Sequence, residues 1–117
     1  MKEKAFQLIA VFFLAAALYH FAGLFYPVND APKWRHTLFV GINALCIYGF
    51  LKRPVWFMYA FFVLLVQQLN SHGSALVSYW EENHLVSWID FSVVLSTPLM
   101  FLMLVYDWQD KRRNTSR

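Results

Sequence analysis

Apolar residues occur in this 117-residue chain in long runs that no charged residue interrupts. The first run covers residues 5–26, and Gln7 and His20 are its most polar members. About 20 predominantly apolar residues are enough for a helix to cross the hydrocarbon core of a bilayer. Only 15% of the residues are charged against 59% that are hydrophobic, which is too little charge to cover a soluble domain of this size. The sequence therefore predicts an integral membrane protein.

Four transmembrane helices are predicted, at about residues 5–26, 34–51, 55–72 and 85–106. Pro27 and Pro32 end the first helix, and Lys52-Arg53-Pro54 forms a tight connection that makes the second and third helices an antiparallel hairpin. The strictly apolar part of the third helix covers only residues 55–66, so this helix must carry residues 67–72 into the membrane. A longer helix that continues toward Trp80 is the alternative, with Gly73 as its weak point. Residues 81–84 are a predicted polar loop. The expected fold is an all-α, antiparallel four-transmembrane-helix bundle that forms a single domain over residues 1–117.

The distribution of basic residues predicts the orientation of this bundle. Lys2 and Lys4 with the alanines at 15–17 imitate a secretory signal, but the apolar run continues to the length of a full span. In the four-helix arrangement, only Lys33 and Arg35 lie on one side of the membrane. The other basic residues share the opposite side, namely Lys2, Lys4, Lys52, Arg53, Lys111, Arg112, Arg113 and Arg117. The positive-inside rule thus predicts a multi-pass protein of the cell membrane with both termini cytoplasmic. The basic residues flank apolar segments, so we do not expect nucleic acid as a partner.

Polar residues are concentrated in the extracytoplasmic half of the predicted bundle. A carboxylate inside a membrane helix costs about 2.5–3.5 kcal/mol on insertion scales and usually faces a cavity or a partner. Asp90 is such a residue, and we expect it to contact one of His20, His36 or His72, since no lysine or arginine lies at its depth. The sequence predicts one ligand-binding pocket built from His20, His36, Asn43, Gln67, Gln68, His72 and Asp90.

Several functions fit such a pocket. The first hypothesis is a membrane protein that binds a small polar or amphiphilic ligand, as an accessory subunit of a larger membrane complex or as a homo-oligomer. The alternative is a membrane-embedded enzyme or redox protein for a lipid-soluble substrate such as a quinone or isoprenoid, with Asp90 and a histidine exchanging protons. A haem or metal site at His20, His72 and Asp90 is a third reading. A purely structural subunit is the fourth, and the sequence assigns no cofactor.

Other patterns in the sequence exclude few of these four functions. The sequence contains no His-Glu-x-x-His string, no glycine-rich phosphate loop and no nucleophile elbow. Asn43, Gln67 and Gln68 are also typical of residues that link membrane helices by hydrogen bonds. We expect lipid-facing surfaces to be rich in phenylalanine, for example at Phe12, Phe57, Phe61 and Phe62.

Overall fold

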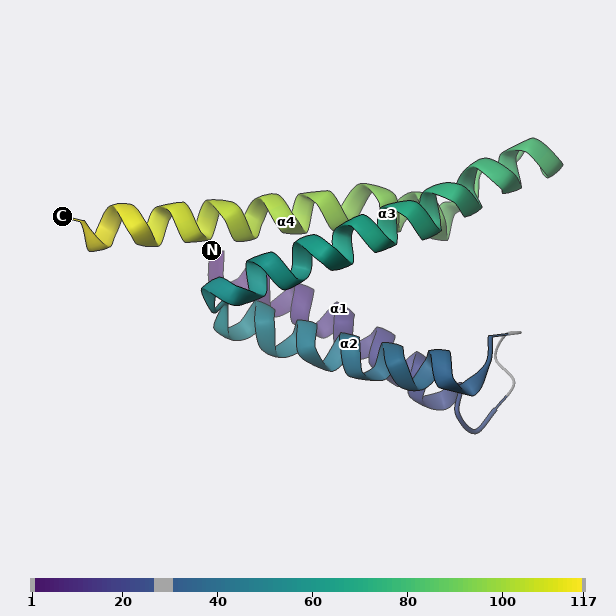
Figure 1. Ribbon diagram of the computed structural model, residues 1–117, viewed down its shortest axis with the longest axis horizontal. Helices are drawn as coiled ribbons and strands as arrows, with labels where there is room; N and C mark the ends of the chain where they lie inside the picture. Colours follow the sequence, from purple (N-terminus) through teal and green to yellow (C-terminus); the bar gives the residue numbers. More distant parts are fainter. Residues whose placement is uncertain (1, 27–30, 117) are drawn as a thin grey trace. The chain divides into compact units, whose positions relative to one another are not determined.

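The computed structural model describes residues 2–26 and 31–116, which contain four α-helices and no strand. These are α1 (Lys2–Ala22), α2 (Lys33–Lys52), α3 (Val55–Asn83) and α4 (Trp88–Thr115). The chain divides into two compact units, residues 1–54 and residues 55–117. Each unit is a pair of packed helices, α1 with α2 and α3 with α4 (Figure 1). The predicted hairpin of the second and third helices falls on the boundary between these units, so it stays a prediction, as does the single domain.

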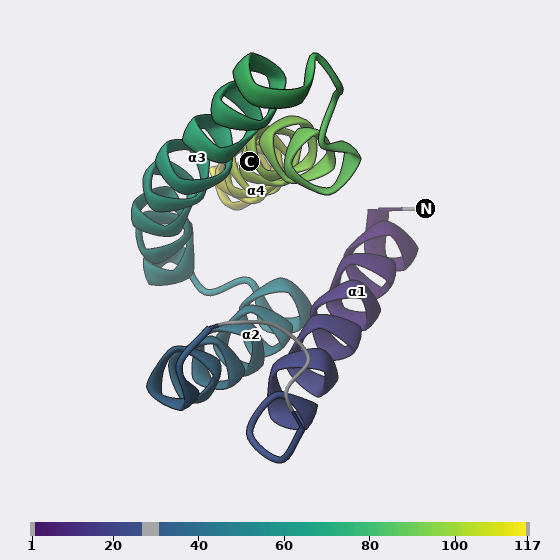
Figure 2. The same cartoon turned by 90° about the vertical axis from the view of Figure 1, so that its right-hand side faces the viewer.

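The first unit is an antiparallel hairpin. Residues of α1 face residues of α2 with the same offset at both ends of the hairpin. Phe6 on α1 stacks on Phe50 of α2 with ring centroids 6.2 Å apart, and His20 lies beside His36 nearer the turn. At the open end, the Arg53 guanidinium pairs with Glu3 at 2.5 Å and lies 4.3 Å from the centre of the Phe6 ring. Arg53 ends α2 in a left-handed conformation with φ 49°, and these contacts hold its side chain there. Figure 2 shows the two helices side by side from a second direction.

The second unit is also an antiparallel hairpin, but its helices are offset. Phe62 contacts Phe101 with ring centroids 5.5 Å apart, and His72 contacts Asp90. This register places the first residue of α4, Trp88, opposite a residue near 74 of α3. The last turns of α3 therefore extend past the start of α4, and the short segment 84–87 returns along them.

Three of the four predicted helices differ from the observed ones at their ends. α1 ends at Ala22 rather than at residue 26, and hydrogen-bonded turns continue to Tyr26. α3 does not end at residue 72 but continues to Asn83, so the predicted polar loop at 81–84 is mostly helix. Gly73, the expected weak point, is tolerated because one glycine costs a helix only about 1 kcal/mol. α4 begins three residues later than predicted, at Trp88, and continues to Thr115.

The phenylalanine prediction is half right. Phe12 and Phe62 are exposed, whereas Phe57 and Phe61 are each only 1% exposed. Phe57, Phe61 and the buried Leu65 are four residues apart and share one face of α3, which is its packing face.

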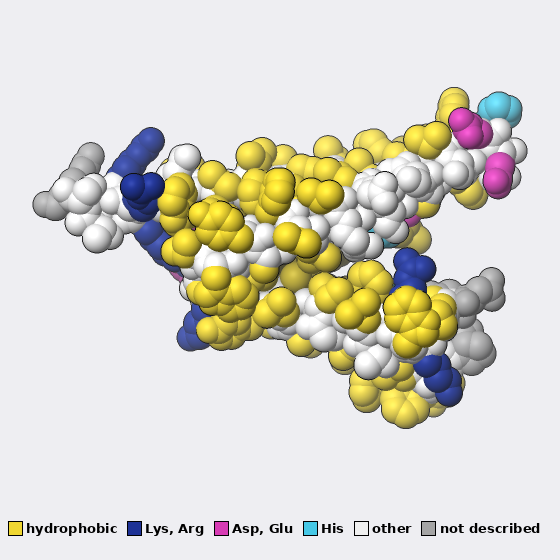
Figure 3. Space-filling view, viewed as in Figure 1, with side chains coloured by type: hydrophobic (Ala, Val, Ile, Leu, Met, Phe, Trp, Pro, Cys, Tyr) yellow, Lys and Arg dark blue, Asp and Glu magenta, His cyan; other side chains and the backbone are white. Residues whose placement is uncertain are grey.

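Two helices, α1 and α4, are long and apolar enough to cross a membrane. In each of them only 11% of the most apolar window is buried, whereas the core helix of a soluble protein is mostly buried. Hydrophobic side chains cover much of the helix surfaces in Figure 3, and Lys and Arg side chains gather at the C-terminal end of α4. This distribution is consistent with association with a membrane.

Candidate functional site

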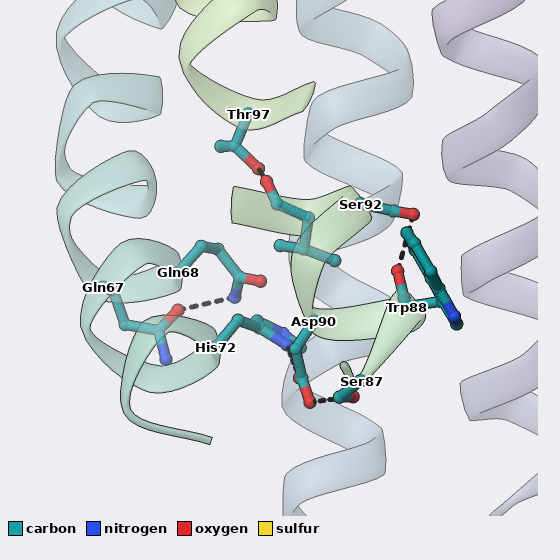
Figure 4. A network of polar contacts seen from close by, with 9 residues as sticks. Gln67, Gln68, His72, Ser87, Trp88, Asp90, Ser92 and Thr97 are labelled. Carbon is teal, nitrogen blue, oxygen red and sulfur yellow. Dashed lines mark hydrogen bonds and ion pairs between the residues drawn. The ribbon is translucent and has the colours of Figure 1, made fainter. Parts of the chain in front are cut away.

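A pair of ionisable side chains connects α3 to the first turn of α4. His72 Nδ1 lies 2.6 Å from Asp90 Oδ1, and Ser87 Oγ donates a hydrogen bond to Asp90 Oδ2 at 2.5 Å (Figure 4). The side chains of His72 and Asp90 are 29% and 19% exposed, so the pair is shielded on most sides but open on one. The predicted contact between Asp90 and a histidine is therefore present.

The local sequence explains why Asp90 is held in place. Ser87 is the N-cap of α4 and Asp90 is the third helical residue, so the carboxylate lies beside the positive end of the helix dipole. A serine followed three residues later by an acid, just before an apolar run, resembles a capping box. Here the Ser87 hydroxyl does not cap the backbone and bonds to the Asp90 carboxylate instead. Asp90 thus lies in the first turn of α4, nearer the helix end than the sequence suggested.

This geometry determines what the imidazole of His72 can do. An ionised Asp90 accepts a hydrogen bond from Nδ1, so the proton of a neutral His72 lies on Nδ1 and a lone pair lies on Nε2. In the described part of the chain Nε2 makes no hydrogen bond. A carboxylate behind a histidine fixes the orientation of the ring and its tautomer. Nε2 can therefore accept a hydrogen bond or a proton, or donate one when the ring is charged.

The two glutamines lie one turn away on α3. Gln68 Nε2 donates to Gln67 Oε1 at 2.6 Å, and Gln67 is exposed. Figure 4 shows this pair beside His72, with the hydrogen bond joining the two glutamines to each other. Gln67 and Gln68 therefore lie near the His72–Asp90 pair without completing it.

The other three predicted residues belong to the first unit. His20 Nδ1 lies 3.0 Å from His36 Nδ1, and His36 is only 2% exposed. Asn43 is buried and donates from Nδ2 to the carbonyl of Phe39 on its own helix at 2.7 Å. Asn43 therefore satisfies a backbone group of α2, and among the residues that the structure describes it makes no hydrogen bond to either histidine.

The seven predicted residues thus form two groups in two units. His20 meets His36 in one unit, and His72 meets Asp90 in the other. The single pocket that would contain all seven stays a prediction, as does the haem or metal site at His20, His72 and Asp90. Among the residues that the structure describes, no group of three or more His, Cys, Asp or Glu side chains could hold a metal ion.

Two residues outside the predicted pocket shape these groups. Ser87 orients Asp90, and its capping-box spacing was the available signal. Gly23 is buried against the ring of His36, where a methyl group would come within 2.7 Å of the imidazole. The signal for Gly23 was its spacing from Ala16 and His20, which places small residues beside the histidine on one face of the helix, where a neighbouring helix can approach closely. Comparison of the chain with protein-family models, with curated proteins and with solved structures found no match.

Proposed function

We propose that this chain is a four-span membrane protein that binds a small polar or amphiphilic ligand through His72 and Asp90, on the extracytoplasmic side. The observation that carries the proposal is the half-shielded His72–Asp90 contact, which leaves Nε2 of His72 open to a ligand.

The membrane part of the proposal is supported by exposed apolar side chains. The apolar windows of α1 and α4 are almost entirely unburied, and α3 exposes Phe62, Val63 and Val66 before its polar residues begin. Monomeric soluble proteins rarely expose contiguous apolar surface on this scale. The eight-to-two division of lysines and arginines supports cytoplasmic termini.

The register of the second unit predicts the depth of the site in the membrane. A helix needs about 20 residues to cross the roughly 30 Å hydrocarbon core. Twenty residues from the start of α3 at Val55 reach Ser74, which is opposite the start of α4 at Trp88. The His72–Asp90 pair would then lie just inside the outer boundary of the hydrocarbon core, where ionisable groups are less costly than at its centre.

This depth suits a ligand with a polar head and an apolar body. A hydroxyl group could donate to Nε2 of His72, and a carbonyl could accept from it when the ring is protonated. The apolar body would lie along the exposed hydrophobic side chains of the same hairpin. Asp90 would keep His72 oriented and balance its charge.

The test is the retention of small molecules by the purified full-length protein. Wild type, Asp90→Asn, His72→Gln and the control Ser92→Ala are purified in mild detergent, and their organic extracts are compared by mass spectrometry. Ser92 is exposed and bonds only to the carbonyl of Trp88, so its loss leaves the pair intact. We expect a compound retained by wild type and Ser92→Ala and lost from the other two at equal helical content. Equal retention by all four proteins, or no compound retained by wild type, contradicts the proposal.

A second candidate function is proton transfer to a lipid-soluble substrate. The carboxylate–histidine arrangement favours it, because such a pair holds a general base in one tautomer with Nε2 facing the reactant. The two functions are separated by incubating the protein with the retained compound. Conversion that stops in His72→Gln identifies an enzyme, and unchanged compound identifies a binding protein.

A further inference from the structure

One exposed face of α4 changes from apolar to basic along its length. Residues that are three or four apart share a face of a helix. The side chains of this face are exposed, and the first four are aliphatic or aromatic. We call this face the α4 stripe, and it consists of Leu95, Leu99, Leu102, Tyr106, Gln109 and Arg113. An exposed apolar surface about three turns long therefore leads to an arginine.

A second arginine, Arg112, is adjacent to the stripe and is held by a tryptophan. The guanidinium carbon of Arg112 lies 4.9 Å from the centre of the Trp108 ring, which is the geometry of a cation–π contact. Lys111 pairs with Asp107 at 3.0 Å. In the part of the chain that the structure describes, neither Arg112 nor Arg113 forms an ion pair with a carboxylate. Both arginines are exposed, so an external anion can reach them.

The length of α4 indicates the depth of these arginines in the four-span arrangement proposed above. About 20 residues cross the hydrocarbon core, and 20 residues from Trp88 reach Asp107. Trp108 would then lie at the inner boundary of the core, where tryptophan is common. Arg112 is about 8 Å further along the helix, and its side chain reaches back over Trp108. Its guanidinium would thus lie in the headgroup region, which is about 5–8 Å thick on each side of the core.

We propose that Trp108, Arg112 and Arg113 form a binding site for an anionic phospholipid of the cytoplasmic leaflet, with an acyl chain along the α4 stripe. A guanidinium can form two parallel hydrogen bonds to a phosphate group. The stripe favours a lipid over a free phosphate ion, because it gives the acyl chain an exposed apolar surface that leads to the arginines. The proposal rests on the membrane topology proposed above and is independent of the ligand at His72.

Native mass spectrometry of the full-length protein in detergent micelles tests the site. The probes are the anionic dioleoyl phosphatidylglycerol and the zwitterionic dioleoyl phosphatidylcholine. Wild type should bind phosphatidylglycerol more tightly, because the cation of phosphatidylcholine opposes its approach to the arginines. Each basic residue near a surface of anionic lipid contributes about a fivefold gain in affinity. Arg112→Gln/Arg113→Gln should therefore bind phosphatidylglycerol about 25-fold more weakly, with phosphatidylcholine binding and helical content unchanged.

A charge-matched control separates a local site from the net charge of the protein. Lys33→Gln/Arg35→Gln removes two exposed positive charges from the start of α2 and should bind phosphatidylglycerol as wild type does. Glycerophosphoglycerol, which is the same head group without acyl chains, should not displace the lipid at tenfold excess.

Four results would overturn the lipid site. These are equal binding of the two lipids by wild type, undiminished binding by Arg112→Gln/Arg113→Gln, an equal loss in Lys33→Gln/Arg35→Gln, and displacement by glycerophosphoglycerol. Equal binding of the two lipids would favour an acidic protein segment as the partner of the arginines. The membrane topology is checked separately by reconstituting wild type into vesicles and washing them with alkaline carbonate. Release of the protein would refute the topology and the lipid site together, whereas retention with equal lipid binding would refute the lipid site alone.

Discussion

Replacing Gly23 by alanine should destabilise the first hairpin, and the structure gives the size of the effect. A methyl group at this position would lie 2.7 Å from Cε1 and Nδ1 of His36 and 2.8 Å from its Nε2. The imidazole is buried and bonded to His20, so it cannot swing aside without breaking that bond. Overpacking of this kind costs about 1–3 kcal/mol. The smaller conformational freedom of alanine in the unfolded chain returns about 0.4–1 kcal/mol.

The expected net loss is therefore about 1–2 kcal/mol in the free energy of unfolding. Gly41 provides a matched control on α2, because a methyl group there meets no atom within 4 Å. Gly41→Ala should stabilise the protein by about 0.5–1 kcal/mol, the usual gain from alanine inside a helix. Both variants can be measured by reversible unfolding in mixed micelles of a mild detergent and dodecyl sulfate, followed by the helical circular dichroism signal. A Gly23→Ala protein as stable as wild type, beside a stabilised Gly41→Ala, would refute the assigned packing of His36.

Two further predictions concern the backbone and the topology. His84 has a left-handed backbone with φ 53° and an exposed side chain, so His84→Gly should stabilise the protein by about 0.5–1 kcal/mol in the same unfolding assay. Arg53 has a similar φ, but Arg53→Gly also loses the Glu3 and Phe6 contacts and should be less stable than wild type by about 1 kcal/mol; a gain would show that these contacts contribute nothing. An impermeant thiol reagent applied to intact cells should label single cysteines at Asp30 and Glu82 but not at Asn114, in a Cys46→Ala background. Labelling at Asn114 alone would reverse the proposed orientation.

The helical class and the breaks between the helices could be predicted from the sequence because they depend on local signals. Long apolar runs, and the tight connection that ends in Pro54, placed α2 within one residue of its observed ends. The extension of α3 to Asn83 was predicted only as an alternative, and only as far as Trp80. Its polar residues have no strong preference between helix and loop, and its single glycine is a weak terminator.

The types of side chain in the candidate site could be predicted from the sequence. The pairs that these side chains form could be predicted less well. A carboxylate in an apolar helix must find a partner, and this argument correctly led from Asp90 to a histidine. Which histidine it meets depends on the register of α3 against α4, and this register is determined by packing over the whole hairpin. The pairing of His20 with His36 is a similar case, since it depends on the absence of a side chain at Gly23.

The ion pair between Glu3 and Arg53 has a consequence for the order of events during synthesis. These residues lie at the two ends of the first unit, so the last stabilising contact of that hairpin is available once residue 53 has left the ribosome. The interactions that pair α1 with α2, from Phe6–Phe50 to His20–His36, all lie within those residues. The N-terminal hairpin can therefore assemble while α3 is still being translated. Domains generally fold as units during synthesis, with the N-terminal one first.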